Sequence, residues 1–138
     1  MSGPEELPAA YAAAVDARRW SDLAALFTED AVLVTPDPPR SLDPVLESRG
    51  RDAIVATVRQ VEAFERTQHL VSRQQWSVGD GIAAGIAQGE AHHVVAGDRP
   101  HAWVWHVEYA DDCVLTDAGW LIARRALTVH EIEKRDLG

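Results

Sequence analysis

The first half of the chain carries apolar residues at helical spacing. A helix is predicted to begin at Gly3-Pro4-Glu5-Glu6, where proline suits the first helical position and the acids face the positive end of the helix dipole. Apolar residues then recur every three or four positions until Arg18-Arg19. Trp20-Ser21-Asp22 opens a short second helix, and an amphipathic pattern predicts a third helix over residues 52–66.

The second half changes to the pattern of β-strands. A short strand is predicted over residues 31–34, and four longer strands over 69–78, 82–95, 101–109 and 120–129. The longer strands are separated by sequences typical of hairpin turns, namely Gly79-Asp80-Gly81, Gly97-Asp98 and Asp117-Ala118-Gly119.

This order of elements predicts an α+β fold. Helices come first and a meander of strands follows, which favours N-terminal helices packed on one face of a strongly curved antiparallel sheet. Four prolines predict a long loop over residues 36–49, which is either a lid over a site or a plain surface excursion. We expect one domain over residues 1–132, followed by a loose polar tail over residues 133–138.

The length, net charge and cysteine content of the chain limit its possible functions and location. The chain has 138 residues, of which 46% are hydrophobic, enough for one globular domain with its own core. Its net charge of −9 argues against nucleic acid or an anionic membrane surface as partner. No apolar run approaches the roughly 20 residues of a membrane helix. Acids where a signal peptide needs bases, and a single cysteine that fits a reducing compartment, predict a cytoplasmic location.

The most aromatic stretch of the chain is residues 101–109, HAWVWHVEY. Because side chains alternate along a strand, one face of it would hold His101, Trp103, Trp105, Val107 and Tyr109. Large aromatic surfaces with polar edges suit the wall of a ligand pocket. A sheet face packed on a helix, with the indoles filling the core, explains the same pattern. The alternation alone leaves both interpretations open.

Four stretches resemble the nuclear transport factor 2-like superfamily, which includes ketosteroid isomerase, scytalone dehydratase and the SnoaL-like polyketide cyclases. They are YAAAVDARRWSDLAALFTEDA at 11–31, GRDAI at 50–54, TQH at 67–69 and GWLIARRAL at 119–127. The resemblance spans roughly residues 5–130. It implies a cystatin-like α+β barrel, that is, a cone-shaped sheet whose mouth holds a small apolar molecule. It also implies a homodimer formed through the sheet, and no cofactor.

The isomerase residues carry over only in part. Tyr11 falls at the position of the tyrosine that donates a hydrogen bond to the substrate oxyanion, a role that a buried phenol can perform. Thr35 and Trp105 fall where the isomerase has its two acids, and the second of these positions also serves the cyclases. Steroid isomerisation is therefore not predicted.

The resemblance to the dehydratase implies two catalytic histidines, His69 and His92. A histidine suits proton transfer because its ordinary pKa lies near neutrality, so it both accepts and donates a proton. The dehydratase aspartate of the first helix falls on Ala13. Asp16, one turn further along, is interpreted as a residue that ends the helix. Glu90 is expected on the same strand face as His92, where its carboxylate would orient the imidazole. Alternatively, Glu90 lies in solvent at the rim of the pocket.

Further ligand contacts are expected from His101, Trp103, Trp105 and Arg124. The resemblance to the isomerase implies that Arg124 lies on the strand face that lines the cone. There it is expected to pair with a carboxylate of the protein or to bind an anionic group of the substrate. No spacing of histidines and acids supports a metal site.

These observations predict cofactor-free acid-base chemistry, of the dehydratase or isomerase type, on an aromatic, polyketide-like or steroid-like molecule. The alternative is a non-catalytic ligand-binding or assembly module of the same fold, which the missing acids at Ala13, Thr35 and Trp105 favour.

Overall fold

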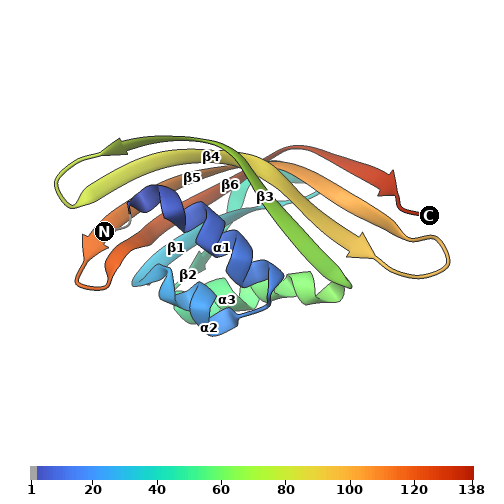
Figure 1. Ribbon diagram of the computed structural model, residues 1–138, viewed down its shortest axis with the longest axis horizontal. Helices are drawn as coiled ribbons and strands as arrows, with labels where there is room; N and C mark the ends of the chain where they lie inside the picture. The colour runs from blue at the N-terminus through green and yellow to red at the C-terminus, as the bar shows by residue number, and fades with distance from the viewer. Residues whose placement is uncertain (1–2) are drawn as a thin grey trace.

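Three helices lie against the concave face of a curved, six-stranded sheet (Figure 1). This arrangement is seen in a computed structural model, which describes residues 3–138. The α+β class, with N-terminal helices over the concave side of the sheet, is confirmed.

The helical part begins with a short 3-10 turn, Pro4–Glu6, that leads into α1, Leu7–Asp16. Helix α2 covers Trp20–Ala25, and α3 covers Arg51–Val58 and continues as the 3-10 helix Arg59–Ala63. All three predicted helices are therefore present. None of the helices within residues 3–138 is long and apolar enough to cross a membrane.

The strands run in the spatial order β2-β1-β6-β5-β4-β3. Their bounds are Phe27–Asp37 for β1, Ser41–Arg49 for β2, Arg66–Val78 for β3, Ile82–Val95 for β4, His101–Thr116 for β5 and Gly119–Asp136 for β6. Every neighbouring pair is antiparallel except β1 and β6, which are parallel. The sheet is therefore mixed, and it stays open because β2 and β3 form its two edges.

The predicted loop over 36–49 is wrong, because this segment forms a hairpin between β1 and β2. Pro38 and Pro39 lie in its turn, and Pro36 lies where the register of β1 shifts. Pro44 is part of β2, an edge strand, where a residue without an N–H group is tolerated.

The predicted hairpins that join β3 to β4, β4 to β5 and β5 to β6 are confirmed. Each of their turns contains a glycine with positive φ, at Gly81, Gly97 and Gly119. The prediction of a loose polar tail over residues 133–138 is wrong. Strand β6 continues to Asp136, and its last residues pair with β5 as far as His101.

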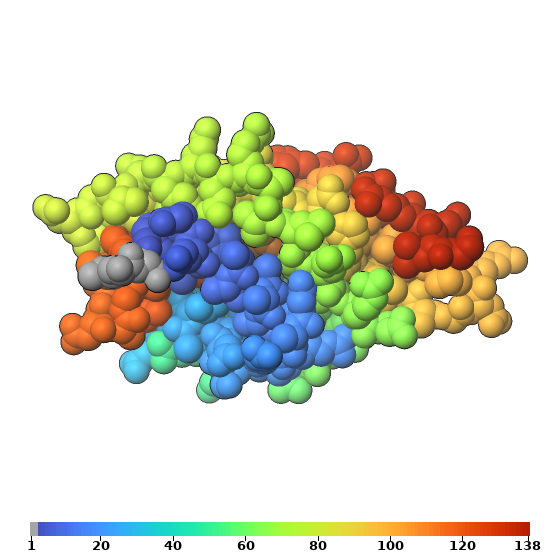
Figure 2. Space-filling view, viewed as in Figure 1, coloured from blue at the N-terminus to red at the C-terminus, as the bar shows by residue number. Residues whose placement is uncertain are grey.

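The main core lies between the helices and the concave side of the sheet. Val15, Leu23, Phe27, Ile54 and Ile122 have no exposed surface there. In the space-filling view, α1 (dark blue) lies directly against β3 (yellow-green), so the helices cover one side of the curved sheet (Figure 2). The space that they leave beside this core is the site described next.

Candidate active site

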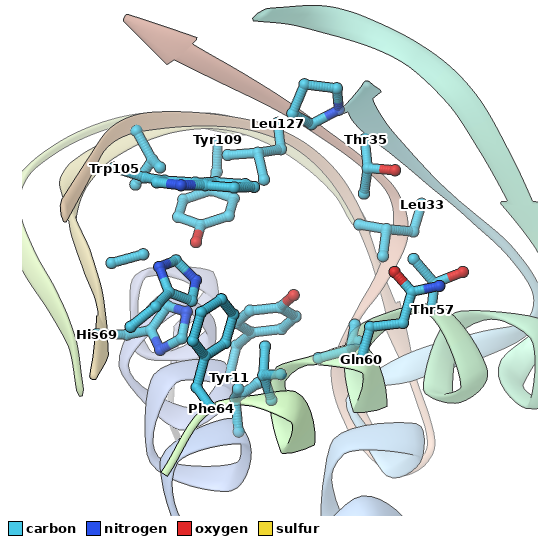
Figure 3. A pocket seen from close by; sticks show the side chains of 17 residues that line it. Tyr11, Leu33, Thr35, Thr57, Gln60, Phe64, His69, Trp105, Tyr109 and Leu127 are labelled. Carbon is cyan, nitrogen blue, oxygen red and sulfur yellow. The ribbon is translucent and has the colours of Figure 1, made fainter. Parts of the chain in front are cut away.

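A cavity of about 330 Å³ lies between the helices and the concave face of the sheet. Most of its wall is apolar, contributed by Val15, Leu33, Val58, Val61, Phe64, Val107 and Leu127. Its polar groups come from Tyr11, Thr35, Thr57, Gln60, His69, His93 and Tyr109, and the Trp105 indole lies along one side (Figure 3). An apolar wall with a few convergent polar groups is typical of a small-molecule site.

A carboxylate and an imidazole form a pair at the wall of this cavity. Asp16 is the last residue of α1, and His69 lies near the start of β3. His69 Nδ1 lies 2.7 Å from Asp16 Oδ1, and the backbone N–H of His69 donates to Asp16 Oδ2 over 2.8 Å. The Thr67 hydroxyl also donates to Asp16 Oδ1, at 3.0 Å. These three hydrogen bonds fix the position of the carboxylate.

The hydrogen bonds keep Asp16 ionised. Burial alone would raise the pKa of Asp16, but the hydrogen bonds from the His69 ring and backbone and from Thr67 outweigh it and lower the pKa below its ordinary value. An ionised Asp16 accepts the Nδ1–H of His69, and in the neutral form of the ring the lone pair then lies on Nε2. This is the tautomer of a general base, and the His69 side chain is only 11% exposed.

A second histidine, His93, lines the same cavity from β4. Its Nδ1 lies 3.1 Å from the backbone carbonyl oxygen of Trp103, to which it donates. The residue is 5% exposed, and its ring packs against Phe64 and Trp105. Burial lowers the pKa of His93 to about 4, against the partial opposition of the Trp103 carbonyl, so His93 is neutral at physiological pH. Its Nε2 is then a hydrogen-bond acceptor.

Two phenols, Tyr11 of α1 and Tyr109 of β5, complete the polar set. Their rings are 5.9 Å apart between centroids, and their hydroxyl groups point into the cavity (Figure 3). Burial raises the pKa of both tyrosines, with the positive charge of Arg125 acting in the opposite direction. Both phenols therefore stay protonated and serve as hydrogen-bond donors.

The arrangement combines an oriented base with acceptors and donors in a largely apolar cavity. Such a set can take a proton from carbon and stabilise the negative charge that develops. No group of three or more histidine, cysteine, aspartate or glutamate side chains within residues 3–138 is placed to hold a metal ion.

Three of the predicted site residues, Tyr11, His69 and Trp105, line the cavity. His92 does not, because it points to the opposite face of β4, where its Nε2 lies 2.8 Å from Glu90 Oε1. The prediction of His92 as a pocket histidine is therefore wrong by one position. Its neighbour His93 takes that place.

Arg124 is also off by one position. It is exposed on the face of β6 away from the cavity, and Arg125 is the buried arginine. His101 and Trp103 lie outside the cavity. They belong to the first residues of β5, in the β4–β5 hairpin that extends beyond the helices (Figure 1). His101 donates from Nδ1 to the Arg99 carbonyl oxygen there, at 2.9 Å.

The sequence reasoning missed Asp16 and His93, and it placed Tyr109 on the face suited to a pocket wall without giving it a role in the site. Asp16 carried a usable signal, because an acid at the C-terminal end of a helix opposes the helix dipole and so needs another reason to be there. His93 was deducible from the hairpin, since opposite residues of an antiparallel pair share a face. Counting back from the Gly97-Asp98 turn pairs Ala91 with Trp105 and so puts His93 on the face of Trp105.

Solved structures with the same fold include proteins of several described activities. A candidate scytalone dehydratase from Novosphingobium aromaticivorans is 24% identical, over 97% of this chain and 86% of that chain, with a TM-score of 0.80. The protein Kfla4162 from Kribbella flavida is 22% identical, over 94% and 89%, with a TM-score of 0.81. A type 3 LinA hexachlorocyclohexane dehydrochlorinase from Novosphingobium barchaimii is 15% identical, over 94% and 86%, with a TM-score of 0.75.

At identities below 25%, these likenesses establish the shared fold alone. No curated protein matches the chain. The family model of the SnoaL-like domain matches residues 5–126, and the chain therefore belongs to the SnoaL-like domain family.

Proposed function

We propose that this protein is a cofactor-free lyase that removes a proton from carbon in a small, largely apolar molecule, with His69 as the general base. One observation carries the proposal, the 2.7 Å contact between His69 Nδ1 and Asp16 Oδ1 at the wall of an apolar cavity. A carboxylate that orients an imidazole and stabilises its protonated form is the arrangement that general bases use.

The elimination needs no other reactant. His69 Nε2 takes the proton, the electrons of the C–H bond form a new double bond, and the leaving group departs with its electron pair. Where the leaving group is a hydroxyl, the protonated His69 returns its proton and water departs. Asp16 stabilises the imidazolium between these two steps. The neutral His93 accepts a hydrogen bond from a donor group of the bound molecule.

The size and polarity of the cavity support a compound of one to three rings with few polar groups. Two of the similar folds belong to proteins described as eliminating enzymes, a candidate dehydratase and a dehydrochlorinase. Those names support the reaction class and leave the substrate of this chain open.

The test is a thermal-shift screen of hydroxylated ring ketones, phenols and chlorinated cyclohexanes. A ligand present at a hundred times its Kd raises stability by about 2.7 kcal/mol, a readily measured shift. Each compound that binds is then incubated with the protein in D2O, and mass spectrometry follows elimination or exchange of its C–H hydrogens. We expect Asp16→Asn to slow this reaction by about 100-fold and His69→Gln to slow it further, with binding retained.

His92→Gln is the matched control, because His92 also lies on a strand beside a carboxylate but faces away from the cavity. It should react at the rate of the wild type. Compounds that bind without exchange or conversion would contradict the lyase proposal and favour the non-catalytic binding module.

We further propose that the protein is a homodimer that forms through the convex face of the sheet. Support comes from that face itself, which no helix covers (Figure 1) and which exposes Leu70 and Ile86. The cytoplasmic location inferred from composition stays a prediction.

A further inference from the structure

A fully buried ion pair lies directly behind the two cavity tyrosines. Arg125 of β6 donates from Nε and Nη2 to the two carboxylate oxygens of Asp111 on β5, at 2.7 and 2.8 Å. Both side chains have no exposed surface. The guanidinium carbon lies 4.3 Å from the ring centroid of Tyr11 and 4.1 Å from that of Tyr109. Neither Arg125 nor Asp111 lines the cavity, so the pair reaches a ligand only through the tyrosines.

This pair is a poor device for stability alone. Taking two charges out of water costs free energy that their attraction repays only in part, and well-packed apolar residues usually serve a core as well or better. Arg125 Nη1 is moreover buried without a hydrogen-bond partner among residues 3–138. Such a costly arrangement, placed against two functional side chains, indicates a role in what those side chains do.

We propose that Arg125, held by Asp111, is a positioning residue that makes Tyr11 and Tyr109 a paired donor site for an oxygen atom that becomes negatively charged during the reaction. The guanidinium group contacts both rings from one side and so fixes their relative orientation. Its positive charge draws electron density from both rings, which strengthens the hydrogen bonds that their hydroxyl groups donate. Both hydroxyl groups point into the cavity, where a ligand can reach them (Figure 3).

This inference rests on the proposed function and names its substrate class, a ring compound with a carbonyl group next to the carbon that loses the proton. His69 Nε2 takes that proton, and the electrons of the C–H bond move onto the carbonyl oxygen, giving an enolate. The two phenols donate to the enolate oxygen. The enolate then reforms the carbonyl as the bond to the leaving group breaks, and the leaving group takes that electron pair. A saturated chloroalkane offers no oxygen to this site.

Binding of a stable oxyanion tests the inference without any turnover. The probes are 2-naphthol, whose phenolate mimics an enolate, and 2-methylnaphthalene, which has a similar shape and no oxygen. We expect the wild type to bind 2-naphthol at least about tenfold more tightly, the contribution of one charge-assisted hydrogen bond. We also expect the bound naphthol, followed by its absorption spectrum, to ionise at lower pH than it does in water.

Asp111→Val/Arg125→Met removes both charges and keeps apolar packing. It should reduce the preference for 2-naphthol below about threefold while binding 2-methylnaphthalene as the wild type does. Tyr11→Phe and Tyr109→Phe should each reduce the preference, and His69→Gln should keep it, which separates this inference from the role of the base.

Two outcomes would overturn the inference. One is an unchanged naphthol preference in the doubly substituted protein, which would make the ion pair purely structural. The other needs only the wild type and so applies even where the double variant does not fold. If the wild type shows no preference for 2-naphthol and does not lower its ionisation pH, the two phenols are not an oxyanion site.

Discussion

His92 and His93 are chemically identical neighbours with opposite surroundings. The alternation of β4 turns His92 to the convex face, beside Glu90, and turns His93 into the cavity, where the Trp103 carbonyl holds its Nδ1–H. Burial then lowers the pKa of His93 to about 4. The role of each histidine is therefore decided by strand parity and burial rather than by residue type.

The lowered pKa of His93 predicts a pH-dependent stability. The unfolded chain takes up a proton at this histidine near its ordinary pKa of about 6.5, whereas the folded protein resists protonation until about pH 4. The contribution is therefore complete above pH 6.5 and is lost as the pH falls toward 4. We expect the free energy of unfolding to fall by about 2 kcal/mol between pH 7 and pH 5, measured by urea denaturation.

His93→Gln should remove most of this decrease, because glutamine does not titrate. His92→Gln is the control and should keep it. An equal decrease in the wild type and in His93→Gln would place its origin at other groups.

At the scale of secondary structure, the sequence predicted the order of the elements well. The bounds of β4 were predicted as they occur, because clear turn sequences flank a long alternating segment. The hairpin from β1 to β2 was missed because proline disfavours strands in general, while an edge strand, a turn and a register shift each tolerate it.

Two of the errors at the site share one cause. The resemblance placed residues to within one position, and a shift of one position moves a strand side chain to the other face. His92 and Arg124 were both misplaced in this way, and β5 contains two register shifts opposite β6 that no residue pattern announces. Asp16 and His69 are separated by 53 positions in sequence, so only the packing of α1 on β3 brings them together.

Gly89 on β4 gives the sharpest prediction at this scale. A Cβ atom there would lie 1.9 Å from the backbone carbonyl oxygen of Leu70 on β3, close to the register shift between Val71 and Arg73. Backbone atoms move only if the strand moves, so Gly89→Ala should lower the free energy of unfolding by about 2–3 kcal/mol in urea denaturation. Ala84→Ser, on the exposed side of the same strand, should stay within about 0.5 kcal/mol of the wild type.

Unchanged stability of Gly89→Ala would mean that β3 and β4 do not approach each other as described. The close approach lies one residue from His69, so we also expect this variant to weaken ligand binding in the cavity.

At the scale of the whole molecule, the curvature of the sheet creates both the site and an uncovered surface. The helices fill the concave side incompletely, and the remaining space is the cavity. The convex side carries alternating polar residues, with Glu90, His92 and Glu108 among them, around the exposed Leu70 and Ile86. The two sides of one sheet are thus available for separate purposes, one for ligand and one for association.

This separation predicts a dimer whose dissociation leaves the cavity intact. Exposed Leu70 and Ile86 would lie between the two copies, so Leu70→Glu/Ile86→Glu should give a monomer in light scattering after size-exclusion chromatography, while 2-methylnaphthalene binds unchanged. Arg40→Glu, at an exposed position in the β1–β2 turn, is the control for added negative charge and should stay dimeric. Because each copy carries a net charge of −9, association should strengthen as salt screens the repulsion between copies. A wild type that is monomeric at high salt and at concentrations of about 100 μM would contradict the proposed dimer. If the monomeric variant no longer bound 2-methylnaphthalene, the two sides of the sheet would not be independent.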